Sequence, residues 1–107
     1  MNFSLIPDAQ AELDDAFQWY ETQSGGLGDR FLGEVVHAFE LIRQFPSAWH
    51  PLSANTRRCR LKRFPYGVIY AQVGDDIVVV GIAHLHREPN YWSERFNSDH
   101  PQGDYPD

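Results

Sequence analysis

The stretch "RRCRLKRFPYGVIYAQVGDDIVVVGIAHLH", residues 57–86, decides the fold class. In its first part, Cys59 and Leu61 alternate with charged residues, which is the period of a half-buried strand. "VIYAQV" predicts a second strand, "GDD" a tight hairpin turn, and "IVVVGIAHLH" a third strand. The third strand is apolar on both faces, so we expect it to lie inside the sheet with a cover on each side.

The residues before this stretch have the period of helices. Residues 2–6 predict a short strand, and Pro7 with Asp8 marks a helix start, Asp8 being placed to accept hydrogen bonds from free N–H groups. Apolar residues then recur at helical spacing until "SGG", and again from about residue 27 until Pro46, which ends the second helix. The sequence predicts an α+β domain, with an N-terminal strand and an antiparallel helical hairpin packed on one face of a small, mainly antiparallel sheet. The other face is then left for a partner.

The length of 107 residues fits one domain. We expect a folded domain over residues 1–96 and a polar, flexible tail over residues 97–107, with an irregular connection at residues 46–56. The N-terminus lacks the pattern of a signal peptide, and the single cysteine, Cys59, excludes an internal disulfide. These features predict a cytoplasmic protein, and no motif in the sequence calls for a cofactor.

Positive charge is concentrated in one segment of an acidic chain. The net charge is −6, yet five of the nine Lys and Arg residues lie in residues 57–63: Arg57, Arg58, Arg60, Lys62 and Arg63. On a strand, Arg58, Arg60 and Lys62 share one face about 7 Å apart, close to the spacing of anionic groups along an extended chain. Two interpretations stay open: a site for an anion or an acidic partner, and an edge strand protected from aggregation by charge.

The segment "HLHREPNYW" carries the residues that could do chemistry. His86 could transfer a proton and Arg87 could stabilise a phosphoryl transition state, so that with Arg60 and Lys62 they would supply the parts for cleaving RNA. The alternative is a hydrogen-bonded structural histidine. His84 and His86 form an H-x-H pair, but no third ligand has a committed position, so we expect no metal site.

Two aromatic residues close this segment. Tyr91 and Trp92 are expected to pack at the edge of the sheet, with stacking on a base as the alternative.

"RRCRLKRFPYGVIYAQVGDDIVVVGIAHLHREPNYWSERF", preceded by a strand and a helical hairpin, resembles the RelE/ParE superfamily of toxins from type II toxin–antitoxin systems. The resemblance covers approximately residues 2–96 and rests on the order and spacing of "LKRFPYGVIY", "GDD" and "H-x-H-R-x-P-x-Y-W". It implies an antitoxin partner, a role that includes plasmid stabilisation, and one of two activities. RelE-like members cleave mRNA in the ribosomal A site, whereas ParE-like members poison DNA gyrase without a known catalytic centre.

The residues favour the ParE-like branch. Arg60 and Lys62 match the basic strand of the nuclease branch, and Arg87 matches its arginine after the last strand. However, Gly67 stands where nucleases commonly have an arginine, Tyr91 comes earlier than their tyrosine, and the chain is acidic. We therefore expect a toxin that inhibits growth by binding a target such as gyrase. A RelE-like endonuclease using Arg60, Lys62, His86 and Arg87, and a binding module without toxicity, are the alternatives.

The same resemblance predicts the binding surface. The antitoxin or the target is expected to contact Arg58, Arg60, Lys62, Arg63, Arg87 and Trp92, in a hetero-oligomeric toxin–antitoxin complex.

Overall fold

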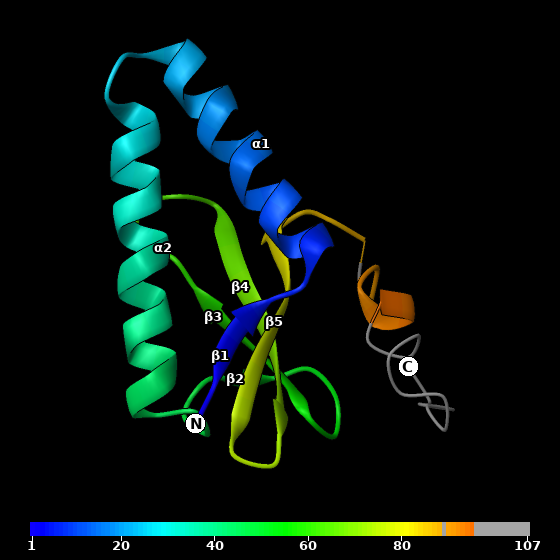
Figure 1. Cartoon of the computed structure of the whole chain (residues 1–107). Coiled ribbons are helices and arrows are strands. Elements are labelled where there is room, and N and C mark those ends of the chain that lie inside the picture. The colour runs from blue at the N-terminus through cyan, green and yellow to red at the C-terminus, as the bar shows by residue number, and fades with distance from the viewer. Residues whose placement is uncertain (89, 96–107) are drawn as a thin grey trace.

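The helices and strands follow one another as the sequence predicts, with one further short strand. The computed structural model describes residues 1–88 and 90–95; Phe96 and the predicted tail at residues 97–107 lie outside the described residues. The elements are β1 Phe3–Leu5, α1 Pro7–Gln23, α2 Leu27–Gln44, β2 His50–Pro51, β3 Thr56–Arg60, β4 Tyr66–Val73 and β5 Asp76–His84. The predicted α+β architecture is confirmed (Figure 1).

The five strands form one sheet in the order β1-β5-β4-β3-β2. β1 runs parallel to β5, with Phe3 beside Ile77, and all other neighbours are antiparallel. The chain therefore brings its first strand back against its last one. β5 has a neighbour on each side, as its apolar sequence predicts.

The helix ends follow local backbone chemistry. Pro7 occupies the first helical position, where its missing N–H costs nothing. Asp8 makes no capping hydrogen bond, in contrast to the expectation; it lies in the first turn of α1 and pairs with Arg95 at 3.3 Å. Gly26 precedes α2 with a φ of 89°, a conformation that glycine adopts without strain. Gly74, with a φ of 61°, makes the tight turn between β4 and β5.

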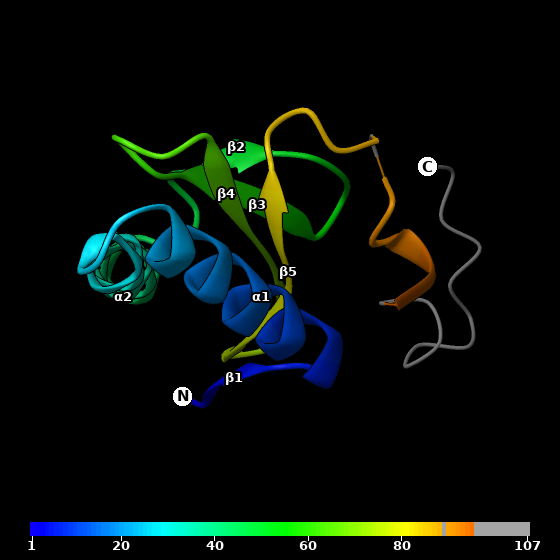
Figure 2. The same cartoon turned by 90° about the horizontal axis from the view of Figure 1, so that it is seen from above.

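Both helices cover one face of the sheet, as the view from above shows (Figure 2). The main core lies between the helices and this face. It includes Leu13, Tyr20, Phe31, Val35, Ile42, Cys59, Val68, Tyr70, Val79 and Ile82. The register of β4 against β5 shifts between Ile69 and Tyr70, as at a β-bulge.

The opposite face of the sheet carries a second, smaller core, which corrects the expectation that this face is left open. Ile69, Ala71, Val80 and Ala83 pack there against Trp92, which is 5% exposed. Trp92 comes from the segment after β5, which contains one helical turn at residues 93–95. The chain thus covers part of this face itself.

Two strand boundaries also differ from the sequence-based expectation. The connection at residues 46–56 contains β2, which pairs with β3 through His50 and Pro51. β5 ends at His84, so His86 lies in a turn and does not share a strand face with His84.

Candidate functional site

The predicted basic face is divided between a strand and a loop. Arg58 and Arg60 belong to β3, but Lys62 follows its end, so the three do not form one strand face. Lys62 and Arg63 lie in the turn between β3 and β4, after the Leu61 N–H bonds to the Tyr66 carbonyl at 2.9 Å. The carboxylate of Glu34 in α2 accepts the backbone N–H groups of both residues at 3.1 Å each and so ties this turn to the helix.

Arg60, Lys62 and Arg63 border a groove of about 290 Å³ between α2 and β3, here called the α2–β3 groove. The other lining residues are Gly33, Glu34, His37, Ala38, Leu41, Trp49, Cys59 and Leu61. Burial raises the pKa of the Cys59 thiol to about 11, so this lining residue stays uncharged at neutral pH. The groove combines an apolar floor with three exposed cations and one carboxylate.

The buried indole N–H of Trp49 has no hydrogen-bond partner within residues 1–88 and 90–95. A buried donor without a partner costs stability, and this nitrogen is not exposed to the groove. The apolar floor and the three exposed cations suit the α2–β3 groove to an apolar segment that carries carboxylates.

Arg58 lies on the other face of the sheet, away from this groove. Its side chain passes over Gly67, where an added Cβ would come within 2.9 Å of the Arg58 Cγ. Arg58 also lines a pocket of about 170 Å³ together with His84 and Arg87, here called the Arg58 pocket. Its Nε is buried and lacks a partner among the described residues. Gly67, which takes the place of the nuclease arginine, thus makes room for Arg58.

The four residues expected for a nuclease do not come together. Arg60 and Lys62 line the α2–β3 groove, while Arg87 lines the Arg58 pocket. His86 is exposed in the turn after β5, and its backbone N–H donates to the Nδ1 of His84 at 3.1 Å. The structure brings Arg58, His84 and Arg87 together in place of the expected set.

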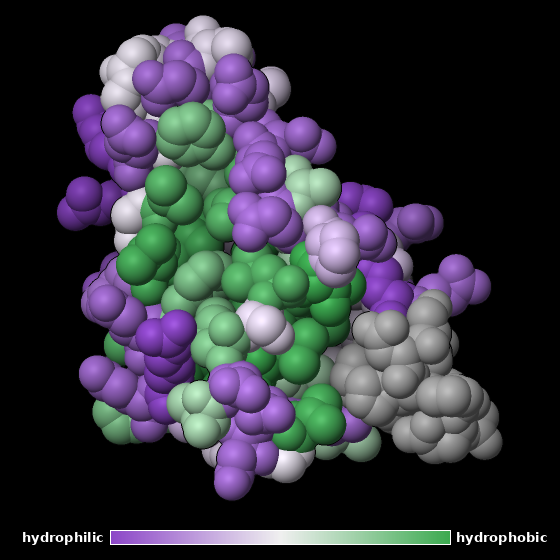
Figure 3. Space-filling view, in the orientation of Figure 1, coloured by the Kyte–Doolittle hydropathy of each residue, from purple (hydrophilic) through white to green (hydrophobic). Residues whose placement is uncertain are grey.

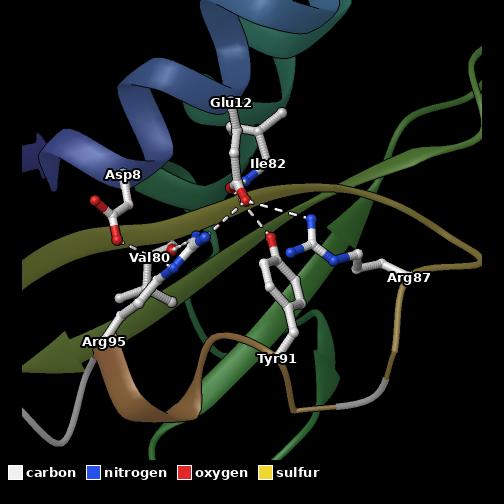
Figure 4. A network of polar contacts seen from close by, with 7 residues as sticks. All are labelled: Asp8, Glu12, Val80, Ile82, Arg87, Tyr91 and Arg95. Atoms are coloured by element: carbon white, nitrogen blue, oxygen red, sulfur yellow. Dashed lines mark hydrogen bonds and ion pairs between the residues drawn. The ribbon is translucent and has the colours of Figure 1, made fainter.

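Glu12 of α1 lies at the centre of a polar network that also includes Arg87 (Figure 4). Its side chain is 16% exposed. The carboxylate accepts the backbone N–H of Ile82 at 3.0 Å and the hydroxyl of Tyr91 at 3.1 Å. It also pairs with Arg95 at 3.0 Å and with Arg87 at 3.8 Å. Because β1 ends at Leu5, the Ile82 N–H donates to a helix carboxylate in place of a strand neighbour.

The network fastens the segment after β5 to the domain. Tyr91 lies between two guanidinium groups, with Arg87 4.0 Å and Arg95 4.8 Å from its ring centre (Figure 4). Arg95, 19% exposed, also donates to the carbonyl of Val80 at 3.2 Å. Tyr91 packs against Gly81 so closely that an added Cβ would lie 2.6 Å from its hydroxyl oxygen. The position of Arg87, half exposed, is thereby fixed by Glu12 and Tyr91.

Tyr91 should make folding stability sensitive to alkaline pH. Burial, and then the Glu12 carboxylate, raise the pKa of Tyr91 well above its ordinary value. The unfolded chain therefore releases the phenolic proton first, so the stabilisation is complete below about pH 10 and is lost as pH rises further. We expect Tyr91→Phe to reduce the loss of unfolding free energy above pH 10 by up to about 1.4 kcal/mol per pH unit.

Urea unfolding between pH 7 and 11 measures this difference. At pH 7 the variant should lose about 1 kcal/mol, because the Glu12 hydrogen bond is gone. Burial also raises the pKa of Tyr70, to about 12, but Tyr70 is present in both proteins and its effect cancels. Equal alkaline slopes for the two proteins would contradict the assignment.

Sequence reasoning missed Glu12 and Arg95. A signal was present: Glu12 stands at helical spacing from the buried residues Ala9, Leu13 and Ala16, on the side of α1 that faces the sheet. A charge there needs a partner. The partner could not be located, because Arg95 lies 83 residues away along the chain and Tyr91 lies 79 residues away.

An apolar surface is present on the helix side. In the orientation of Figure 1, apolar side chains gather between α1 and α2 and extend toward β1 (Figure 3). Leu32 and Val36 of α2 are exposed, and the partly buried Phe3 and Phe39 stack at 5.0 Å. This surface is separate from the Arg58 pocket, which lies on the opposite face of the sheet.

The sequence model of the ParE toxin of the type II toxin–antitoxin system parDE matches residues 4–89. The chain belongs to the ParE toxin family. It is a toxin of a type II toxin–antitoxin system, and the resemblance to the RelE/ParE superfamily is confirmed. The matched span of this ParE-family chain includes Glu12, the α2–β3 groove and Arg87, and ends before Tyr91.

A solved structure has a similar fold. The structure described as the chromosomal ParDE TA system from P. aeruginosa matches with a TM-score of 0.63 and 18% identity, covering 78% of this chain and 95% of that chain. At this identity the likeness concerns the fold. A comparison with curated proteins finds no match.

No helix within residues 1–88 and 90–95 is long and apolar enough to cross a membrane. In the same part of the chain, no three His, Cys, Asp or Glu side chains come together as a metal-binding group.

Proposed function

We propose that an antitoxin neutralises this toxin through the α2–β3 groove, and that the toxin inhibits growth in the cytoplasm by binding a target such as DNA gyrase. The observation that carries the proposal is the composition of the groove. Arg60, Lys62 and Arg63 border an apolar floor that includes Cys59 and Leu61. An extended or helical segment with apolar anchors and carboxylates matches both features.

Action by binding, and not by cleavage, is supported by the separation of the candidate catalytic residues. Arg60 and Lys62 border a different groove from Arg87, and Gly67, where nucleases commonly have an arginine, has no side chain. The Tyr91 hydroxyl is held by Glu12, and its pKa is raised by burial, so Tyr91 is a poor proton acceptor at neutral pH. The net charge of −6 also disfavours general attraction to RNA.

A ribosome-dependent mRNA endonuclease is the second candidate, and one observation favours it. The Arg58 pocket joins two arginines to His84, and the Nε of Arg58 has no partner among the described residues. Such a pocket could bind a phosphate. A domain that binds the antitoxin without being toxic is the third possibility.

Induction of the chain in growing cells distinguishes these functions. We expect growth arrest with filamentation and a DNA-damage response, relief by co-expression of a cognate antitoxin, and inhibition of gyrase supercoiling by the purified chain. Rapid mRNA cleavage at codon boundaries that Arg87→Ala abolishes would overturn binding as the mode of action. Harmless overexpression would overturn toxicity itself.

Arg43→Ala serves as the matched control for Arg87→Ala. Arg43 also stacks on an aromatic ring, that of Phe3 at 4.7 Å, but lies at the far end of α2. Since Arg87 belongs to the Glu12 network, urea unfolding of both variants separates loss of activity from loss of fold.

A further inference from the structure

A further open pocket lies beside the Glu12 network and was not part of the predicted site. It has a volume of about 660 Å³ and is bounded by α1 and by the ends of β4 and β5 that Tyr66 and His84 mark. We call it the α1 pocket. It shares no lining residue with the α2–β3 groove.

Aromatic rings form much of the wall of the α1 pocket. Trp19, Tyr20 and Tyr66 all line it. Trp19 meets Tyr20 edge to face at 5.0 Å, and Tyr20 meets Tyr66 at 6.0 Å. Trp19 remains 56% exposed, which is unusual for a large aromatic side chain that only fills a core. Its indole is thus available to a molecule that enters the pocket.

The same wall carries negative charge. Asp15 lines the pocket, is exposed, and forms no ion pair with any of residues 1–88 and 90–95. It belongs to a helix with five acidic residues and no Lys or Arg between Pro7 and Gln23. The cation that lines the pocket, Arg87, is already paired with Glu12 and stacked on Tyr91. The charge left without a partner at the pocket is therefore that of a carboxylate.

We propose that the α1 pocket receives an arginine side chain from a protein partner. A guanidinium can stack on the exposed indole of Trp19 and donate two hydrogen bonds to the carboxylate of Asp15. Its aliphatic stem would lie along Pro65 and Tyr66. The acidic residues of α1 would attract a basic segment of the partner before the two molecules touch. In the same way, the cations of the α2–β3 groove would attract an acidic segment. The molecule thus offers two docking sites of opposite charge, and the second does not depend on the proposed antitoxin groove.

The test uses the full chain and two short blocked peptides, acetyl-Gly-Arg-Gly-Arg-Gly-amide and the same peptide with glutamates. Titrations followed by NMR report binding at the indole N–H of Trp19 and the backbone amides of Ala16 and Ile82, which also line the pocket. We expect saturable shifts with the arginine peptide and none with the glutamate peptide. Asp15→Asn and Trp19→Ala should each weaken binding about fivefold.

Asp14→Asn is the matched control. It removes the same charge from the same helix, but Asp14 accepts a hydrogen bond from Gln10 and does not line the pocket. Its effect should be less than about twofold. If Asp14→Asn and Asp15→Asn weaken binding equally, the peptide follows the general field of α1 and the proposed pocket is wrong. Shifts at the same residues with a single-stranded RNA oligonucleotide, and none with the arginine peptide, would also overturn it.

Discussion

Replacing Glu12 by alanine is expected to lower the free energy of unfolding by about 3 kcal/mol, because one carboxylate serves four groups. The substitution leaves the Ile82 N–H, the Tyr91 hydroxyl and the Arg95 guanidinium without their shared acceptor. Arg95, at 19% exposure, would lose its closer ion pair and keep the Asp8 carboxylate, the Val80 carbonyl and the Tyr91 ring as neighbours. Arg87 is half exposed and pairs at 3.8 Å, so its contact contributes little.

Urea unfolding at pH 7 measures the change, with Asp14→Ala as the control on the same helix. Asp14 is exposed and bonds only to Gln10 through the side chains, so its loss should remain below about 0.5 kcal/mol. The loss of unfolding free energy for Glu12→Gln should lie between those for Glu12→Ala and Asp14→Ala, since the amide oxygen still accepts hydrogen bonds but carries no charge. A loss below about 1 kcal/mol for Glu12→Ala would show that the network does not stabilise the fold.

Reversing the charge of Arg60 and Lys62 to glutamate should weaken antitoxin binding by about 100-fold. An acidic partner segment would then face like charges beside an apolar floor, which costs several kcal/mol. The remaining affinity should depend less on salt, because the attraction that salt screens has been removed. The measurement is a titration with the cognate antitoxin, at low and high NaCl concentration.

Arg43→Glu provides the control for the single variant Arg60→Glu. Both change the net charge equally, but Arg43 lies outside the α2–β3 groove and stacks on Phe3. Unchanged affinity in the double variant would mean that these cations are only solvated and that the antitoxin binds elsewhere. In that case the apolar surface between α1 and α2, with Leu32 and Val36 exposed, is the next surface to vary.

The fold could be predicted because its elements are specified locally. Pro7 and Pro46 delimit the helical half of the chain, and Gly74 makes the turn that pairs β4 with β5. The alternation of Cys59 and Leu61 places both in the main core. Periods of 3.6 and 2 residues were sufficient, since they are properties of short segments. β2 was missed because two paired residues give no period to detect.

The site could be predicted only in part, because it depends on contacts between distant residues. The alternation of apolar and charged residues predicts a strand that continues through Lys62. In the structure, Lys62 and Arg63 lie in a loop whose backbone N–H groups bond to Glu34 of α2. Trp92 was assigned both to packing and to the binding surface; the structure buries it in the second core. Nothing local indicates that Arg58 lies over Gly67 or that Glu12 meets Arg95.

The pairing of β1 with β5 has a consequence for the synthesis of this toxin. Phe3 lies beside Ile77, 74 positions later in the chain. At about 5–20 residues per second, a ribosome needs about 4–15 s to make the residues between them. During that interval β1 has no neighbour and Glu12 has no Ile82 to bind, so neither pocket lined by Arg87 exists. The nascent chain can therefore complete its sheet and both of these pockets only after β5 has been made.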